Sequence, residues 1–245
     1  MQLDALALRM RPRAPLEAAD LGVRLCQSAA GSVYACYAVV FVPVAALALA
    51  TFEIGVWLPT LILFWSKPWL DRTILFVLSR AAFGQTTTVR QLWVARGAVW
   101  GRQLLLTWTW RRLSPWRSFT QPVYQLEGLR FGRIRQRVKQ VRRRKQAAAL
   151  LMTLSFFMAQ LCLVLAGVSL LLWFAPGENA RRTFFEMLFD PDSAFFEAST
   201  AVAFAIVLAF LEPFYVAAGF AMYLNRRAEL EAWDVEQELR RAFAS

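Results

Sequence analysis

Charged residues inside apolar segments are the first candidates for chemistry in this chain. Glu212, followed by Pro213, is the only charged residue between 198 and 224. A carboxylate near the middle of a membrane span costs about 2.5–3.5 kcal/mol on insertion, so it usually faces protein or water. Pro213 removes a helical hydrogen bond and frees a nearby carbonyl. Glu212 is therefore either a proton- or substrate-linked carboxylate at a hinge, or a group that locks its helix to a neighbour through Lys67 or Arg72.

A second concentration of charge is the sequence KPWLDR at 67–72. One interpretation is a cytoplasmic stop in which Lys67 pairs with Asp71, four residues later, if a helix continues past Pro68. The alternative is a polar lining between two half-helices, as in transporters with discontinuous helices. The candidate intramembrane polar site consists of Glu212, Pro213, Lys67, Asp71 and Arg72.

Several reaction classes lack their usual residues. The chain has no histidine, and its three cysteines, Cys26, Cys36 and Cys162, form no CxxC motif. Histidine-dependent triads and most zinc or haem sites are thereby excluded, and a redox pair is not expected. No Walker A, GxGxxG or GxSxG motif occurs. We expect no cofactor, no metal and no enzymatic activity.

The elements that position these residues are predicted from composition and charge. The chain has 245 residues, 58% of them hydrophobic, with a mean hydropathy of +0.40 and a net charge of +11. These values favour an all-α, polytopic membrane protein with amphipathic interfacial and cytoplasmic helices. The segment before Glu53 gives one clear span, whereas 54–79 is either part of a full span or a broken, re-entrant element. The four expected transmembrane helices cover about 30–52, 51–69, 149–174 and 198–224.

A strongly basic insertion separates the two predicted pairs of spans. Residues 85–145 contain 15 Lys and Arg against the single acid Glu127. Periodicity predicts helices over 87–113 and 126–146, joined by a linker, SPWRSFTQP. Helices lying on anionic inner-leaflet lipids come first among the interpretations, followed by docking of an acidic protein partner, with nucleic acid last. The candidate contact residues are Arg130, Arg133, Arg135, Arg137, Lys139, Arg142, Arg143, Arg144 and Lys145.

Charge also predicts the threading. The basic insertion should be cytoplasmic and the 176–197 loop, with a net charge of −3, extracytoplasmic. Four spans then place both termini inside, where arginines flank the ends. The expected divisions are 1–84, with an amphipathic segment from Leu16 and the first pair of spans; 85–146, the basic insertion; 147–225, the second pair; and 226–245, a polar cytoplasmic helix.

Four stretches together resemble a known family: RPRAPLEAADLG (11–22), KPWLDRTILFVLSRAAFG (67–84), RRLSPWRSFTQPVYQLEG (111–128) and EPFYVAAGFAMYLNRRAELEAWDVEQELRR (212–241). The chain resembles uncharacterised multi-spanning bacterial inner-membrane proteins associated with DUF4129 domains. Such proteins are typically encoded near MoxR-type ATPases, von Willebrand A-domain, transglutaminase-like and SpoIIM-like proteins. The resemblance implies a membrane component of a multi-protein envelope system, and it marks the charged residues of 67–72 and Glu212-Pro213 as family features.

The expected function is a non-enzymatic membrane scaffold or partner-docking subunit. Its partners would be the bilayer, anionic inner-leaflet lipids, membrane or cytoplasmic proteins such as the MoxR-type ATPase system, and possible further copies of the chain. The alternative is a small transporter, channel or lipid-handling protein that uses Glu212 and the Lys67–Arg72 segment.

Overall fold

The protein is all-helical in the part that the structure describes. The computed structural model describes residues 13–101, 114–129, 131–173 and 194–231, and these ranges contain no strand. Three helical segments are long and apolar enough to cross a membrane: Ala30–Glu53, Gln146–Leu170 and Ala194–Glu231. The all-α class and the membrane-compatible helices predicted above are therefore confirmed.

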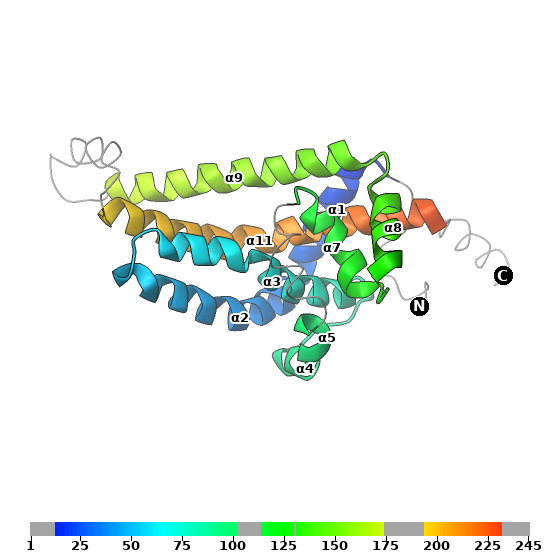
Figure 1. The fold of residues 1–245 in the computed structure, drawn as a ribbon, viewed down its shortest axis with the longest axis horizontal. Helices are drawn as coiled ribbons and strands as arrows, with labels where there is room; N and C mark the ends of the chain where they lie inside the picture. The colour runs from blue at the N-terminus through cyan, green and yellow to red at the C-terminus, as the bar shows by residue number, and fades with distance from the viewer. Residues whose placement is uncertain (1–12, 102–113, 130, 174–193, 232–245) are drawn as a thin grey trace.

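The long helix α11 (Ala194–Glu231) is the centre of the bundle (Figure 1). It continues through Pro213 without interruption, and α1 and α9 (Gln146–Trp173) pack along it. Helix α1 (Pro15–Ser28) reaches it through small residues. A Cβ atom on Gly22 would lie 2.6 Å from the carbonyl carbon of Ala217. The predicted amphipathic N-terminal helix thus exists, but it packs against α11.

Helices α2 (Ala30–Ala50) and α3 (Leu58–Ala81) form an antiparallel hairpin joined by the 3-10 turn η2 (Thr51–Glu53). Helix α3 passes straight through Pro68, so the boundaries predicted from 51 to 69 are wrong and there is no break into half-helices. The helix continues because its later residues, including Leu70 and Ile74, are fully buried against the bundle. It is long enough to span but carries four charged residues, and it is not among the three membrane-compatible segments.

The basic insertion differs most from expectation. Instead of one helix over 87–113, the described part has two short ones, α4 (Val89–Val94) and α5 (Arg96–Trp100), with non-helical backbone at Ala95 between them. Tertiary contacts override the helical pattern, because the Trp100 indole donates to Thr73 and its ring packs 5.6 Å from that of Trp69. The remainder, 102–113, lies outside the described residues.

The predicted linker is a helix buried in the bundle. Helix α7 (Arg117–Leu126) has seven consecutive buried residues from Arg117 to Val123 and packs against α11. A Cβ atom on Gly219 of α11 would come within 2.5 Å of the Ser118 carbonyl carbon. Only glycine allows this approach of the two backbones. Part of segment 85–146 therefore completes the core of the bundle.

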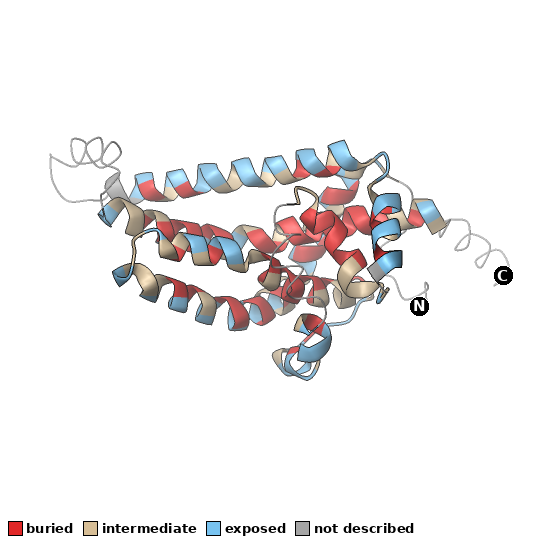
Figure 2. Cartoon of the chain, in the orientation of Figure 1, coloured by how far each residue is buried: buried red, intermediate tan, exposed pale blue. Residues whose placement is uncertain are grey.

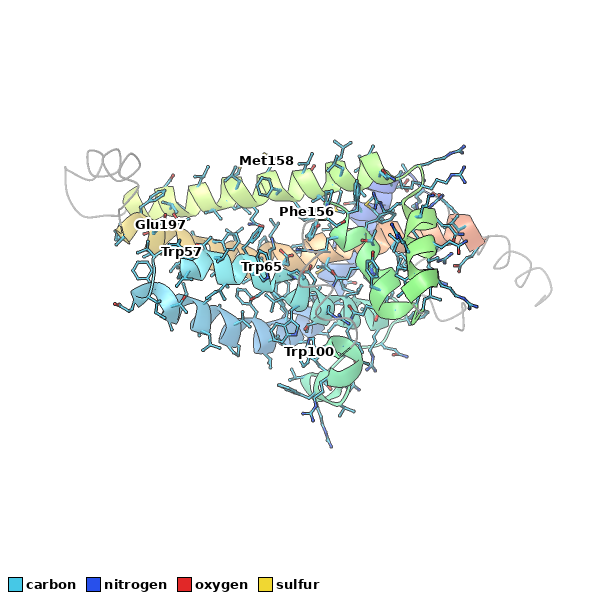
Figure 3. All side chains as sticks on the ribbon, in the orientation of Figure 1. Trp57, Trp65, Trp100, Phe156, Met158 and Glu197 are labelled. Carbon is cyan, nitrogen blue, oxygen red and sulfur yellow. The ribbon has the colours of Figure 1, made fainter. Side chains whose placement is uncertain are left out.

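Helix α8 (Phe131–Arg142) crosses the end of the bundle, roughly perpendicular to the long helices (Figure 1). Ile134, Val138 and Val141, spaced four and three residues apart, form an apolar stripe that is buried against the rest of the protein. The outer surface of the bundle exposes large apolar side chains, many of them on α9. Figure 2 shows α9 exposed along much of its length, and in Figure 3 Met158 points away from the bundle whereas Phe156 points into it.

Candidate functional site

Glu212 lies in the middle of a network of buried charges. Its carboxylate is held from two sides, with Lys67 Nζ 2.8 Å from Oε2 and Arg117 Nη2 3.0 Å from Oε1. The residue is only 2% exposed. Of the two partners proposed from the sequence, Lys67 is therefore correct and Arg72 is not. The ion pairs connect three helices, because α3, α7 and α11 each contribute a residue.

Arg117 extends the network to Asp71. Its Nε atom lies 3.0 Å from Asp71 Oδ2, an ion pair whose angles are not those of a hydrogen bond. Asp71 is fully buried and pairs with Arg117. The stop-signal interpretation had proposed Lys67 as its partner instead. Burial lowers the pKa of the Arg117 guanidinium, but the carboxylates of Asp71 and Glu212 raise it, and the net shift is upward. Arg117 therefore stays charged.

The four members of this cluster, Lys67, Asp71, Arg117 and Glu212, sum to zero charge. We call them the charge cluster. Neutrality matters because an isolated buried charge costs several kcal/mol, which a well-placed partner of opposite sign offsets. Removing one partner leaves an uncompensated charge and typically costs about 3–5 kcal/mol. The charge cluster therefore fixes α7 between α3 and α11, with a strong penalty for any arrangement that separates them.

Arg72, the remaining charged residue of the 67–72 segment, has a different role. It is buried, and its Nε donates to the Val99 carbonyl of α5 at 2.7 Å. Its own carbonyl accepts from Gln125 Nε2 of α7 at 2.8 Å. Arg72 thus joins α5 and α7 to α3 and does not touch Glu212.

The turn before Pro213 receives hydrogen bonds from α2. Tyr34 donates its hydroxyl to the Phe210 carbonyl at 2.9 Å, and Tyr37 donates to Leu208 at 3.4 Å. Proline cannot donate to the carbonyl four residues earlier, which loosens the ladder in this turn. The two tyrosines supply donors next to that weak point, so Pro213 is accommodated in a continuous, packed helix. The hinge interpretation of Pro213 receives no support from this geometry.

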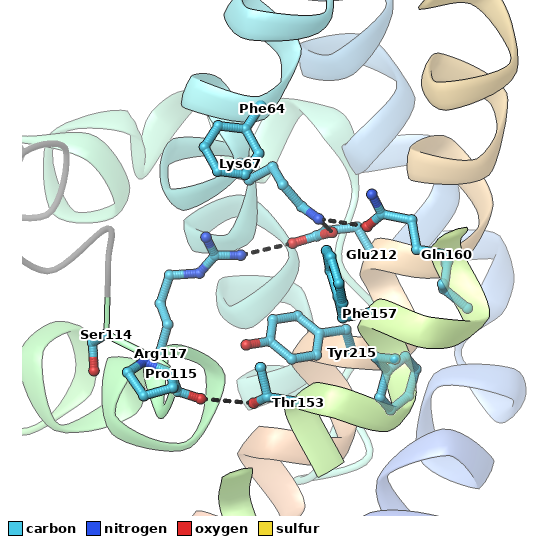
Figure 4. Close-up of a pocket in the computed structure, with 12 residues that line it drawn as sticks. Phe64, Lys67, Ser114, Pro115, Arg117, Thr153, Phe157, Gln160, Glu212 and Tyr215 are labelled. Atoms are coloured by element: carbon cyan, nitrogen blue, oxygen red, sulfur yellow. Dashed lines mark hydrogen bonds and ion pairs between the residues drawn. The ribbon is translucent and has the colours of Figure 1, made fainter. Parts of the chain in front are cut away.

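A cavity of about 330 Å³ lies beside the charge cluster, between α3, α7, α9 and α11. Figure 4 shows Lys67, Arg117 and Glu212 on its wall, and Gln160 of α9 accepting from Lys67 Nζ at 2.8 Å. Four aromatic residues, Phe64, Phe156, Phe157 and Tyr215, also line it. The remaining lining residues are Ser114, Pro115, Thr153 and Leu211. This size is at the lower end of small-molecule sites, which combine apolar walls with a few polar groups.

Arg117 is the member of the site that sequence reasoning missed. It was counted among the 15 basic residues of the insertion and placed in the linker. One signal pointed to it: the two cations of the predicted site, Lys67 and Arg72, are five residues apart and so lie on different faces of one helix. A cation from another helix is needed to reach both acids.

Eight of the nine candidate cations of the basic segment lie within the described residues, and they divide into two groups. Arg137 bridges Glu127 and Glu231, while Lys145 Nζ lies 2.7 Å from Glu229 Oε1. Arg142 stacks on the Trp116 ring, with its guanidinium carbon 3.7 Å from the centroid. These three fasten α8 and the following turn to the bundle. The second group is exposed and has no side-chain ion pair within the described ranges: Arg133, Arg135, Lys139, Arg143 and Arg144.

The ninth candidate, Arg130, lies outside the described residues. We call the five exposed residues Arg133, Arg135, Lys139, Arg143 and Arg144 the cationic face.

Comparisons with protein-family models, with curated proteins and with solved structures find no match to this chain. The charge cluster, the cavity and the cationic face are therefore the features from which its function is inferred.

Proposed function

We propose that the chain is a non-enzymatic docking subunit of a multi-protein system in the bacterial inner membrane. Its sequence blocks resemble the DUF4129-associated membrane proteins described above, which supports a place beside a MoxR-type ATPase. In this proposal the cationic face binds an acidic protein partner at the cytoplasmic surface. The bundle holds that face in place.

The proposed threading has four spans and both termini in the cytoplasm. Helix α3 is the second span in this proposal, although it carries four charges. Its Lys67 and Asp71 are neutralised by Glu212 and Arg117, so they do not face lipid as free ions. The rule that cytoplasmic segments carry excess Lys and Arg supports placing α8 inside the cell.

The observation that carries the docking proposal is the division of α8 into two faces. Its apolar stripe, Ile134, Val138 and Val141, is buried inside the protein, so it is not available to insert into a bilayer. An amphipathic helix that binds lipid does so mainly by burying such a stripe. The outward side of α8 carries positive charge, and the ion pairs of Arg137 and Lys145 fix this surface to α11. A rigid, positive surface favours a complementary acidic protein.

A charge-reversal experiment tests this proposal. The variant Arg135→Glu/Lys139→Glu changes two exposed residues of the cationic face. The matched control Arg90→Glu/Arg96→Glu changes two exposed arginines on α4 and α5 by the same charge. Protein purified from membranes in mild detergent should lose its stoichiometric partners in the first variant and retain them in the control. Equal retention in both would refute docking on α8.

The alternative function, a small transporter or lipid-handling protein, is supported by one specific observation. The cavity of about 330 Å³ reaches Glu212 and Lys67, which is where a transporter would place its substrate-linked carboxylate. Flux into proteoliposomes that is lost in Lys67→Met/Glu212→Gln, which leaves the charge cluster neutral, would favour this function over docking. A tight bundle without flux would leave docking as the better account.

A further inference from the structure

The wall of the cavity beside the charge cluster has unused hydrogen-bond donors and no unused carboxylate oxygen. Glu212 already accepts from Arg117 on one oxygen and from Lys67 on the other. Gln160 uses its carbonyl oxygen to accept from Lys67, while its amide nitrogen donates to none of the described residues. The Tyr215 hydroxyl likewise has no hydrogen-bond partner among them, although the residue is more than nine-tenths buried.

The charged residues on the wall also favour an anionic ligand. Lys67 and Arg117 line the cavity together with one carboxylate, Glu212. Asp71, which balances Arg117, is fully buried behind it and does not line the cavity. A ligand in this cavity therefore meets two cations, one paired carboxylate, an amide N–H group and a phenolic hydroxyl. This donor set matches an oxyanion such as a phosphate, which accepts several hydrogen bonds and favours Arg and Lys.

The other walls of the cavity are apolar and continue to the outer surface. Phe64 of α3 and Phe157 of α9 line it and are 42% and 54% exposed. Helices α3 and α9 both pack against α11, and the hydrogen bond from Lys67 to Gln160 joins them to each other. Figure 4 shows Phe64 and Phe157 on opposite sides of Lys67. The opening between these two helices thus has exposed aromatic side chains on both sides.

The cavity is elongated along the helices of the bundle. On α9 it extends from Thr153 to Gln160, seven residues or about 10 Å of helix. Ser114 and Thr153 lie at the end nearer to α8, and Lys67 lies at the end nearer to Gln160. An elongated molecule can therefore place a polar group inside and an apolar chain in the opening.

We propose that this cavity binds one anionic lipid whose phosphate oxyanion is held by Gln160, Tyr215 and Lys67. An acyl chain of that lipid leaves through the opening between α3 and α9, against Phe64 and Phe157. The site is separate from the cationic face of α8. The inference goes beyond the docking function and does not depend on it.

Native mass spectrometry of the full chain in mild detergent tests the site. The probe is dioleoylphosphatidylglycerol, compared with dioleoylphosphatidylcholine, oleate and inorganic phosphate. We expect one saturable phosphatidylglycerol adduct on the wild type. The variants Tyr215→Phe and Gln160→Leu should each weaken it at least about tenfold, since a hydrogen bond to a charged group contributes about 1.5–3 kcal/mol. Neither variant removes a member of the charge cluster, so the fold should persist, as far-UV circular dichroism can verify.

Two controls separate this site from other lipid contacts. Tyr34→Phe removes a hydroxyl that donates to Phe210 outside the cavity and should leave the adduct unchanged. Arg135→Gln/Lys139→Gln on α8 should remove weaker, additional adducts and keep the tight one. Unchanged affinity in both cavity variants, equal binding of phosphatidylcholine, or a preference for oleate would overturn the proposal. Binding of inorganic phosphate as tightly as the lipid would assign the cavity to a free anion and overturn the lipid part.

Discussion

Removing Glu212 should destabilise the protein more than removing Glu212 and Lys67 together. In Glu212→Gln the charge cluster changes from zero to a net charge of +1, with Lys67 and Arg117 both losing a carboxylate 2.8 and 3.0 Å away. Breaking a buried ion pair in this way costs about 3–5 kcal/mol. Lys67→Met leaves a net charge of −1 and should cost a similar amount. The double variant retains the neutral Arg117–Asp71 pair, so it should cost less than either single variant.

The assay is reversible unfolding of the detergent-solubilised protein by added SDS, followed by far-UV circular dichroism. The free energies of the wild type, two single variants and the double variant form a double-mutant cycle, whose coupling term isolates the Lys67–Glu212 interaction. We expect a coupling of about 3 kcal/mol or more. The control Glu53→Gln removes an exposed carboxylate in η2 and should change stability by at most about 0.5 kcal/mol. Additive single-variant costs would refute the reasoning.

Three other perturbations test the packing around the charge cluster. Gly219→Ala should destabilise by about 1–3 kcal/mol, because its Cβ would lie 2.5 Å from the Ser118 carbonyl carbon; Gly97→Ala, which meets open space, should not, as thermal unfolding would show. Lys145→Glu should release α8 from α11, raising hydrogen exchange over 131–142 relative to the wild type. Burial raises the pKa of the Cys26 thiol to about 12, so maleimide should not modify it at pH 8 before unfolding, and rapid labelling of the native protein would contradict its burial.

The long apolar helices could be predicted from sequence because their signal is local. Apolar stretches of more than 20 residues with at most one charge indicate helices able to cross a membrane, and α2, α9 and α11 appear close to the predicted ranges. The apolar stripe of α8 was likewise visible from its three- and four-residue spacing. In each case the residues that define the element are neighbours in the chain.

The position of α7 could not be predicted in the same way. Its sequence, RSFTQPVYQL, is polar and contains Pro122, so it was interpreted as a linker. It is buried because its partners come from elsewhere: Arg117 meets Asp71 and Glu212, and Ser118 fits against Gly219. These contacts join residues about 45 to 100 positions apart, and no local pattern encodes them. The same holds for the end of α3, where burial rather than hydropathy keeps the helix intact past Pro68.

Three of the four members of the charge cluster, Lys67, Asp71 and Glu212, were predicted from the sequence, and Arg117 was not. A glutamate in an apolar segment requires a partner, which led directly to Lys67. The choice between Lys67 and Arg72 depends on which face of α3 turns toward α11, and only packing decides it. The structure directs Arg72 to the Val99 carbonyl instead.

Site-specific photo-crosslinking from α8 in intact cells tests the docking function most directly. A photoreactive amino acid at position 135 of the cationic face and another at position 158, where Met158 points away from the bundle on α9, give a matched pair. We predict a discrete protein adduct from 135, lost when Arg133 and Lys139 are changed to Glu, and lipid adducts alone from 158. Lipid adducts alone from both positions would contradict the proposal that the cationic face binds a protein.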